Sequence, residues 1–421
     1  MEVIVAFFWR IWERFRDEII LVMIALGWLF LLSTSIQLKP EFTMVGDDWS
    51  YFEAVSKLYF EGLPDEGRPF GIAAIYGLPL LFTDNLDAAI HFGLGLNLCC
   101  WLVSILVVHR ILTERYNSAF HAFAYSVLVL LCVGNLAIAF RFLPEPVFIL
   151  LILLAVLFLN RFELSSKTKH LSVALAILCF AMLIKPVATG LAVIVAVCHF
   201  RSLLAVVKHK SSVLVYAMLV LVGIQMNEMH KAYGDYKISY IGNTTYYNYL
   251  GAKADCYRKN IEFIPGENAR AKHFQSFSIH DQQRLVREDI AEQLQNNTFN
   301  LIKAYGYCLI DNSSKGSYIV ASTYNWDNTF VFRPAKFFFK ALSKAQNILL
   351  TAIGVVLSVY VWIKRKSTSG FSKILAAITL YVFFVSGISC LQTDRFHLVF
   401  FPLVIMMIAE CRNKKAGEEP A

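Results

Sequence analysis

The stretch IILVMIALGWLFLLSTSI (residues 19–36) is followed closely by Gly46-Asp47-Asp48-Trp49-Ser50-Tyr51-Phe52. The first stretch is apolar and nearly as long as the ~20 helical residues that cross a bilayer. Two adjacent carboxylates just beyond such a span indicate a specific role, because charged groups are energetically costly near hydrocarbon. Asp47 and Asp48 are therefore expected to cap a helix, bind a cation or take a proton from a substrate.

The composition of the whole chain is that of a polytopic membrane protein. Of its 421 residues, 57% are hydrophobic and 17% are charged, and the mean hydropathy is +0.54. A soluble domain carries about 25% charged residues. The net charge of +8 does not indicate a nucleic-acid partner, because most Lys and Arg residues lie in short loops between apolar runs. In such loops they set the orientation of the spans.

Apolar runs recur along the sequence and predict an all-α polytopic membrane protein with about ten transmembrane helices. Besides residues 19–36, the runs are 88–109, 118–139, 146–160, 171–184, 187–200, 211–227, 346–363, 371–391 and 397–410. They divide the chain into three parts. These are an N-terminal transmembrane module (1–227), an outer segment (228–345), and C-terminal transmembrane helices with a cytoplasmic tail (346–421).

Basic residues predict the sidedness of these helices. Arg10, Arg14 and Arg16 precede the first run, and no Ala-x-Ala-like cleavage site follows it, which favours a retained span over a signal peptide. Alternation from a cytoplasmic N-terminus puts every short basic loop on one side, as the positive-inside bias requires. These loops hold Arg110, Arg115, Arg161, Lys167, Lys169, Arg201, Lys208, Lys210, Lys364, Arg365, Lys366, Arg412, Lys414 and Lys415.

Helices are also predicted on the outer side. In the first outer loop (37–87), apolar residues recur at helical spacing after Gly46 and stop at Gly62, and the stretch 70–82 is expected to lie along the membrane interface. In the outer segment, residues 228–275 predict only irregular structure. From Ser278 onward, the pattern predicts a helix that starts near Asp281 and then a second helix through 299–310.

Charged residues from distant parts of the sequence gather at the outer mouth. Each has an ordinary structural interpretation: an acidic first turn of a helix, an Arg–Glu pair that braces a tight turn, or a cation that reaches the interface. Together they would form a pocket for an anionic headgroup. The set comprises Asp47, Asp48, Arg141, Glu145, Lys185, Asp394 and Arg395.

Cys256 and Cys308 share the outer segment, where they would either form a disulfide in an oxidising compartment or remain free. The histidines of that segment lack a metal-binding spacing such as H-x-x-x-H, which favours surface histidines.

The pattern of charges favours transfer of a group from a lipid phosphate. The sequence has no Walker A loop, no G-x-G-x-x-G and no H-E-x-x-H motif. The outer face also lacks soluble nucleotide-activated donors, so a transferred group must arrive on a carrier in the membrane. Fixed cations would stabilise the charge that grows on a leaving phosphate. A carboxylate would take the proton of the acceptor hydroxyl.

At this point the sequence resembles a known family. Gly46-Asp47-Asp48-Trp49-Ser50-Tyr51 looks like the acidic pair of GT-C membrane glycosyltransferases, the superfamily that includes protein O-mannosyltransferases and the aminoarabinose transferase of lipid A. The further stretches that are similar to family patterns are Arg141-Phe142-Leu143-Pro144-Glu145, Ile184-Lys185-Pro186, Asp394-Arg395-Phe396-His397 with Pro402, and the helical stretch 285–311.

The resemblance implies an inverting transfer of a sugar from a polyprenyl-phosphate donor. Asp47 would be the base, and Asp48 would be its partner or a group that positions the acceptor. This sequence has Asp-Asp where Asp-Glu is frequent, so the base stays open between the two. Arg141, Lys185 and Arg395 would bind the donor phosphate. Glu145 and Asp394 would support them. Some relatives hold a divalent cation near the acidic pair, and such a cation is an open alternative here.

Two rival functions remain. A lipid-linked polysaccharide polymerase or ligase also has many spans and one long outer loop, but Arg or His clusters are expected in that loop. A transporter or flippase usually carries ionisable groups at mid-bilayer and paired repeats, and the sequence shows neither. Short loops favour a bacterial inner membrane, with the site facing the periplasm. The donor sugar stays open, as does the acceptor, which would be a glycan, lipid or protein, with O-antigen modification as one form.

Overall fold

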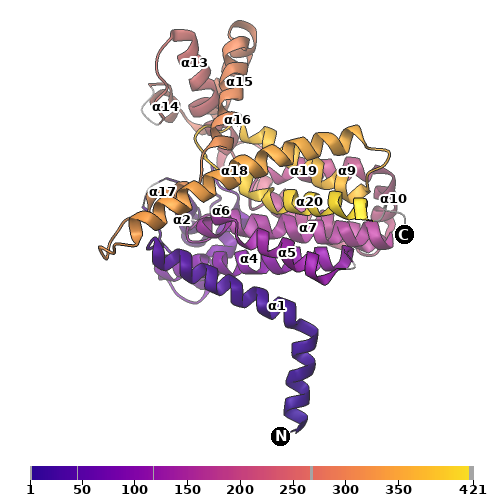
Figure 1. Cartoon of the computed structure of the whole chain (residues 1–421). Coiled ribbons are helices and arrows are strands. Elements are labelled where there is room, and N and C mark those ends of the chain that lie inside the picture. The colour runs from indigo at the N-terminus through magenta and orange to yellow at the C-terminus, as the bar shows by residue number, and fades with distance from the viewer. Residues whose placement is uncertain (1, 45, 117, 266–268, 417–421) are drawn as a thin grey trace.

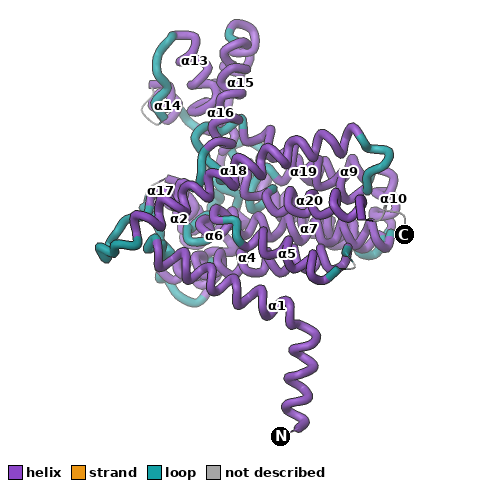
Figure 2. The backbone as a smooth tube through the Cα atoms, in the orientation of Figure 1, coloured by secondary structure: helices purple, strands orange, loops and turns teal. Residues whose placement is uncertain are grey.

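The computed structural model describes residues 2–44, 46–116, 118–265 and 269–416, with side chains between residues 15 and 412. Within these ranges the protein is built of helices, without a β-strand (Figures 1 and 2). The predicted all-α architecture is therefore confirmed. A bundle of helices forms the body, and a smaller group of outer helices projects from the side of the bundle near one end.

Each predicted apolar run forms a helix of the bundle, or two helices in the case of 118–139. The bundle helices are α1 (Glu2–Ser35), α4 (Leu86–Arg115), α5 (Ala119–Leu130), α6 (Val133–Ile138), α7 (Glu145–Ser165), α8 (Thr168–Met182), α9 (Ala188–Cys198), α10 (Phe200–Lys208), α11 (Ser212–Tyr233), α18 (Phe332–Ile363), α19 (Gly370–Ser386) and α20 (Phe401–Ala416). Helix α1 is kinked at Phe15. Helix α18 begins well before residue 346, where the sequence predicted the C-terminal module to start.

Fewer helices than ten are long enough to span a membrane unaided. Five of the described helices meet the length and hydropathy of a span, namely Phe15–Ser35 of α1 and helices α4, α7, α11 and α18. The pair α9–α10, bent by 97°, would make a sixth. Helices α5, α8 and α19 are apolar but have only 12, 15 and 17 residues. The predicted count of about ten includes these shorter helices and α20.

The short helix α5 shows how a broken span is tolerated. The helix stops at Leu130 and resumes as α6 at Val133. At the break, the side chain of Gln346 in α18 donates to the carbonyl of Leu131 and accepts from the N–H of Val133, both at 2.9 Å. Backbone groups freed inside a bilayer must find such partners. Gln346 thereby fixes the break that directs the chain toward Arg141.

Helix α7 lies at the centre of the bundle, packed against α4 and α8. Pro146 in its first turn suits a helix start, because the missing N–H would be unpaired there in any case. Ser166, in the left-handed conformation, ends the helix. Ile152, Val156 and Leu159 are fully buried among neighbouring helices. Because α7 is rigidly enclosed, the residue at its first position, Glu145, is held in a fixed place.

A polar network ties the helices together at the end of the bundle that carries the basic loops. The carboxylate of Glu410 in α20 accepts hydrogen bonds from Arg115 Nη2 at 3.1 Å and Tyr116 at 3.0 Å, and it is paired with Arg115 Nε. It also accepts from Ser369 at 3.1 Å and Ser372 at 3.2 Å. Glu410 is only 7% exposed, so its charge depends on these partners.

Replacing Glu410 with Ala is expected to lower the free energy of unfolding by about 3–5 kcal/mol, because it leaves the Arg115 guanidinium buried without its partner. Thermal unfolding of the purified protein in detergent measures the effect. The control is Glu288→Ala, which removes an exposed ion pair with Arg284 and should cost less than about 1 kcal/mol. Equal unfolding temperatures for the two variants would contradict the expectation.

The first outer loop is helical, as predicted. Helix α2 (Gly46–Ser56) continues as the π-helical turn η1 (Lys57–Glu61) and ends at Gly62 in the left-handed conformation. Helix α3 (Phe70–Tyr76) and the turn η2 (Leu78–Leu81) follow in the stretch expected at the interface. Tyr59 donates a 2.8 Å hydrogen bond to the carbonyl of Ala74, which joins the two halves of the loop.

The outer segment is more helical than predicted. The expected helices are present as α15 (Ile279–Asn296), capped by Ser278, and α16 (Thr298–Ser314). The expectation of irregular structure for 228–275 is wrong, because that stretch contains α12 (Ile241–Thr245), η3 (Tyr246–Gly251), α13 (Ala252–Lys259) and α14 (Ala269–Gln275). The π-helical turn η3 interrupts the regular spacing of a helix, so the sequence pattern does not indicate a helix there. Small apolar clusters on Tyr247 and Leu250 hold these helices to α15 and α16.

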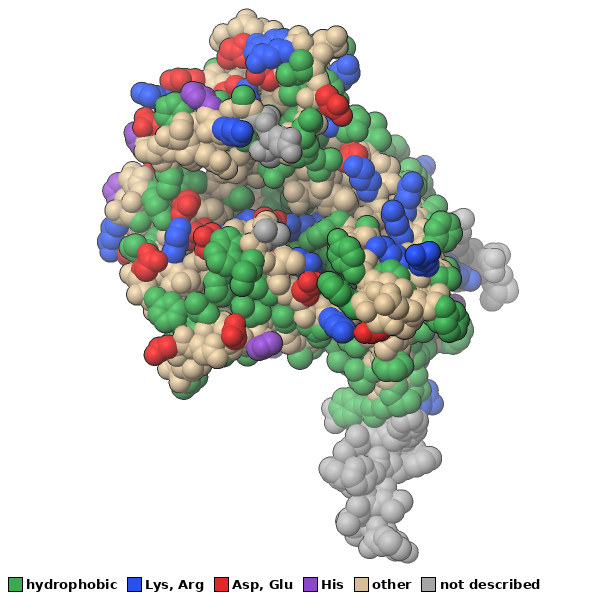
Figure 3. Space-filling view, turned by 90° about the vertical axis from the view of Figure 1, so that its left-hand side faces the viewer, with side chains coloured by type: hydrophobic (Ala, Val, Ile, Leu, Met, Phe, Trp, Pro, Cys, Tyr) green, Lys and Arg blue, Asp and Glu red, His purple; other side chains and the backbone are tan. Residues whose placement is uncertain are grey.

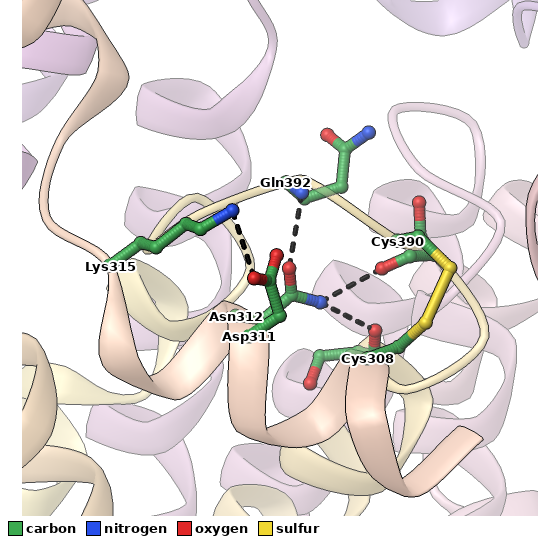
Figure 4. Close-up of a disulfide and its surroundings, with 8 residues drawn as sticks. Cys308, Asp311, Asn312, Lys315, Cys390 and Gln392 are labelled. Atoms are coloured by element: carbon green, nitrogen blue, oxygen red, sulfur yellow. Dashed lines mark hydrogen bonds and ion pairs between the residues drawn. A yellow bond between two sulfur atoms is a disulfide. The ribbon is translucent and has the colours of Figure 1, made fainter. Parts of the chain in front are cut away.

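The disulfide of the outer side joins Cys308 in α16 to Cys390 (Figure 4). The predicted alternative of a Cys256–Cys308 bridge is wrong, because Cys256 is a buried free thiol. Cys390 fell inside the predicted apolar run 371–391, but α19 already ends at Ser386 and the chain folds back onto α16. The two Cα atoms lie 5.0 Å apart, within the range of ordinary disulfides.

Asn312 holds the same return loop beside the disulfide (Figure 4). Its buried side chain donates to the carbonyls of Ser386 at 2.9 Å and Ser389 at 2.8 Å, and it accepts from the N–H of Gln392 at 3.1 Å. All three bonds reach the loop that carries Arg395. The outer helix α16 therefore fixes the position of that loop.

Candidate active site

The predicted acidic pair lies in the first turn of α2. Gly46, which precedes it, has a φ of +71°, in the left-handed region that glycine adopts without penalty. The first turn of a helix favours carboxylates. Consecutive residues on a helix point about 100° apart, so Asp47 and Asp48 face different partners.

Asp48 points into the protein and is only 2% exposed. Its Oδ2 atom accepts from Arg141 at 2.6 Å and 2.9 Å and from the Thr43 hydroxyl at 2.9 Å. Arg141 lies between α6 and α7, and a backbone bridge to Glu41 fixes this part of the chain. Asp48 is therefore a buried carboxylate held by the Arg141 guanidinium and by the hydroxyl and backbone N–H of Thr43.

Asp47 lies between two guanidinium groups. Its Oδ1 atom is 2.5 Å from Arg68 Nη2, and its Oδ2 atom is paired with Arg395 Nη1. The Arg68 side chain also donates to Ser50 at 2.9 Å and stacks over the Tyr51 ring at 4.3 Å. The Asp47 side chain nevertheless remains 37% exposed. A ligand can therefore approach this carboxylate from outside.

Glu145 is fully buried and links two cations. Its Oε1 atom is 2.6 Å from Lys185 Nζ and is also paired with Arg395 Nε. The predicted Arg141–Glu145 pair is not formed, because Glu145 points inward from the start of α7 while Arg141 faces α2. Lys185 and Arg395 do not reach out to the interface, since their side chains are only 13% and 9% exposed.

The result is one continuous cluster at the end of the bundle opposite Glu410. Arg395 joins two carboxylates that are far apart in sequence, Asp47 and Glu145. Figure 3 shows this end hollowed between the outer helices and the body, with charged side chains in the hollow. In all, four cations face three carboxylates: Arg68, Arg141, Lys185 and Arg395 against Asp47, Asp48 and Glu145.

Arg68 is a member of the cluster that was not predicted from the sequence. The available signal was its place in the same outer loop as the acidic pair. The turn that returns it to Asp47 is formed by Asp65, which accepts from the backbone N–H groups of Gly67 at 2.9 Å and Arg68 at 2.8 Å. That turn depends on tertiary contacts of Asp65 with Lys57, which the sequence does not show.

The environment separates the proton affinities of the two aspartates. Burial alone would raise the pKa of Asp47, but the guanidinium groups of Arg395 and Arg68 hold it well below its ordinary value. Burial raises the pKa of Asp48 despite the neighbouring Arg141. Burial also lowers the pKa of Lys185, which Glu145 only partly offsets. Asp47 is thus a weak base while both guanidinium groups are bound to it.

Asp394 lies apart from the cluster. Its side chain is buried against Gly134, where an added Cβ would be 2.5 Å from Asp394 Oδ2. That oxygen has no hydrogen-bond partner among the described residues. Burial raises the pKa of Asp394 to about 7. The family resemblance implies that Asp394 supports the phosphate-binding cations. Because Asp394 lies apart from them, it would do so by holding in place the loop that carries Arg395.

Replacing Asp394 with Asn is expected to raise the unfolding temperature relative to the wild type by more at pH 8 than at pH 5. The folded-state pKa of about 7 lies above the unfolded value, so the wild type loses stability as the pH rises from the unfolded value to about 7, a range in which the unfolded chain releases this proton and the folded chain keeps it. The amide does not ionise. Thermal unfolding at the two pH values measures the difference, and a variant less stable than the wild type at pH 8 would contradict the expectation.

The residues around the acidic pair do not fit a divalent cation in this arrangement. Two guanidinium groups already hold both oxygens of Asp47, and Arg141 occupies Asp48. No group of three or more His, Cys, Asp and Glu side chains suited to a metal occurs in the described part of the chain. A cation at this place would have to displace Arg68 or Arg395 first.

No family model and no curated protein matches the sequence. Among solved structures, the chain is similar to ArnT from Cupriavidus metallidurans in the apo state. The two chains are 12% identical, with a TM-score of 0.37, and the match covers 91% of this chain and 77% of that chain. At this level of similarity, the residues of the site itself are what indicate function.

Proposed function

We propose that this protein is a GT-C-type membrane glycosyltransferase that moves a sugar from a polyprenyl-phosphate donor to a hydroxyl acceptor on the outer face of a membrane. The observation that carries the proposal is the position of Arg395, which pairs with both Asp47 and Glu145. Three segments that are far apart in sequence thereby bring cations and carboxylates into one cluster. Lys185 extends the cationic part of the cluster toward the bundle.

The cationic groups suit a phosphate that is anchored in the membrane. Arg binds phosphate through paired N–H groups, and Lys acts as a point charge. In the proposed complex, the donor phosphate takes the place of carboxylate oxygens at Arg395 and Lys185, while the prenyl chain lies among the spans. Glu145, buried with its Oε2 atom unpaired, keeps these cations in position when the substrate is absent.

The proposed reaction is a single displacement. The acceptor oxygen attacks the anomeric carbon, and the bond from that carbon to the phosphate oxygen breaks. The electron pair leaves with the polyprenyl phosphate, and the acceptor proton goes to Asp47. Attack from the face opposite to the leaving group inverts the configuration. The cations stabilise the charge on the leaving phosphate, as preorganised donors do at developing anions.

Donor binding would also prepare the base. Arg395 and Arg68 hold the pKa of Asp47 low against the effect of burial. When the phosphate engages Arg395, Asp47 loses one of its two ion pairs, and its pKa rises. The carboxylate then becomes a better proton acceptor in the ternary complex than in the free protein. Asp48, paired with Arg141 and Thr43, would orient the acceptor or the base.

The test is mass spectrometry of surface glycans and lipids from host cells with and without the gene. A single-sugar mass difference that Asp47→Asn abolishes is the expected result. A difference of many repeat units would instead support a polysaccharide polymerase or ligase. Identical glycans and lipids in cells that express the protein would contradict the proposal.

A further inference from the structure

A cavity of about 530 Å³ opens beside Arg141. One wall is the connection between α1 and α2, including Leu38, Glu41 and Thr43. The other wall is α17 (Tyr318–Ser322) with the loop that follows it, including Tyr324 and Trp326. Because Arg141 and Thr43 also bind Asp48, the inner end of the cavity adjoins the acidic first turn of α2.

The aromatic wall is held in place by polar side chains. Gln37 is only 7% exposed, and its Nε2 atom donates to Asn325 at 3.0 Å and Thr329 at 3.2 Å. Its Oε1 atom accepts from the N–H of Asp327 at 3.0 Å. Lys336 donates to the carbonyl of Thr323 at 2.6 Å. This loop of residues 323–329 therefore has a fixed conformation.

The fixed loop presents two aromatic rings to the outside. Tyr324 and Trp326 are each 67% exposed, and their ring centroids lie 5.7 Å apart. Apolar rings of this size are costly to leave exposed without a ligand. The cavity wall also offers both hydrogen-bond donors and acceptors, from Ser322, Glu41 and Arg141. Aromatic faces among convergent polar groups match a saccharide ring, whose C–H faces are apolar and whose edge carries hydroxyls.

We infer that this cavity binds a saccharide ring of the acceptor, which stacks on Trp326 and directs a hydroxyl toward Arg141 and the start of α2. The inference rests on the proposed glycosyl transfer. Arg395 and Lys185 do not line this cavity, so they remain for the donor phosphate. The loop projects beyond the outer end of α1 (Figure 1), where a glycan can reach it from outside.

The test compares Trp326→Ala with Phe330→Ala. Phe330 is 91% exposed near the same loop but is not part of the cavity wall. Trp326→Ala is expected to lower the yield of glycosylated product in cells roughly 10- to 30-fold, as expected when a stacking Trp is truncated. Trp326→Phe should recover most of the yield. Phe330→Ala should match the wild type, with all variants compared at equal amounts of membrane-inserted protein.

The outcomes separate this inference from the proposed function. If Asp47→Asn abolishes the product while Trp326→Ala and Phe330→Ala both match the wild type, the saccharide site is wrong and the transferase stands. If the product is unchanged by Asp47→Asn and also by Asp48→Asn, the proposed function fails first.

A direct binding measurement uses methyl glycosides of glucose, galactose, mannose, rhamnose and N-acetylglucosamine with the full-length protein in detergent. Saturation-transfer NMR should detect at least one glycoside with the wild type and lose the signal with Trp326→Ala. No signal for any glycoside would overturn the inference. A second measurement places the protein in nanodiscs with brominated lipids, and takes the Trp326 fluorescence as the wild-type signal minus that of Trp326→Phe. Strong quenching of this signal by the lipids would also overturn the inference, because it would identify the ring as a membrane anchor.

Discussion

Asp47→Asn is expected to lower sugar transfer by about 10²- to 10⁴-fold, the usual contribution of a general base. Asn keeps the size of the side chain but cannot accept the acceptor proton. It also releases Arg68 and Arg395 from their shared carboxylate, so donor binding should survive or strengthen. The measurement is product yield, by mass spectrometry, alongside retention of a labelled polyprenyl phosphate.

The control for Asp47 is Asp87→Asn, because Asp87 is also a first-turn carboxylate, at the exposed start of α4. It should leave transfer unchanged. Asp48→Asn identifies the base: if it abolishes transfer while Asp47→Asn retains most of it, the base is Asp48, and the more solvent-accessible aspartate only holds the cations. Equal activity in both variants and the wild type would exclude the acidic pair from the reaction.

Arg395→Gln is expected to abolish transfer and also to lower the free energy of unfolding by about 3–5 kcal/mol, the usual cost of removing one partner of a buried ion pair. The loss of the guanidinium leaves Glu145 fully buried with Lys185 as its remaining cation. Thermal unfolding and product yield measure the two effects separately.

The double variant Glu145→Gln, Arg395→Gln separates stability from function at the same place. It removes the buried carboxylate together with the guanidinium, so it should recover much of the lost stability but none of the transfer. Arg284→Gln is the matched control, since Arg284 is 69% exposed and its ion pairs are loose, at 3.4 Å and 3.8 Å. A stable and active Arg395→Gln variant would remove this residue from the proposed site.

The sequence predicted which charged residues share one end of the bundle, because alternation of the spans fixes which loops lie together. Asp47, Arg141, Lys185 and Arg395 could be gathered on that basis alone. Their pairing could not. Whether Arg141 meets Glu145 or Asp48 depends on the direction of side chains at the start of α7 and α2, and these directions follow from packing.

Three features depend on contacts that no local pattern records. The turn that brings Arg68 to Asp47 needs Asp65 and Lys57. Cys390, the partner of Cys308, lay inside the predicted apolar run 371–391, because the sequence does not place the end of a helix such as α19 to within a few residues. The aromatic loop after α17 depends on Gln37, from the far end of the first span. Each is a contact between segments of distant sequence.

The Cys308–Cys390 bridge, with a sequence separation of 82, closes a covalent ring that includes α18 and α19. A protease site introduced at Ser367, in the turn between these helices, would therefore nick the polypeptide without separating its halves. The nicked protein should migrate as one band in electrophoresis without reductant and as two with it. A disulfide needs an oxidising compartment, so the single band without reductant would show that α16 and the loop carrying Arg395 lie in the same compartment. The side of the membrane from which the added protease cuts would show on which side the turn at Ser367 lies.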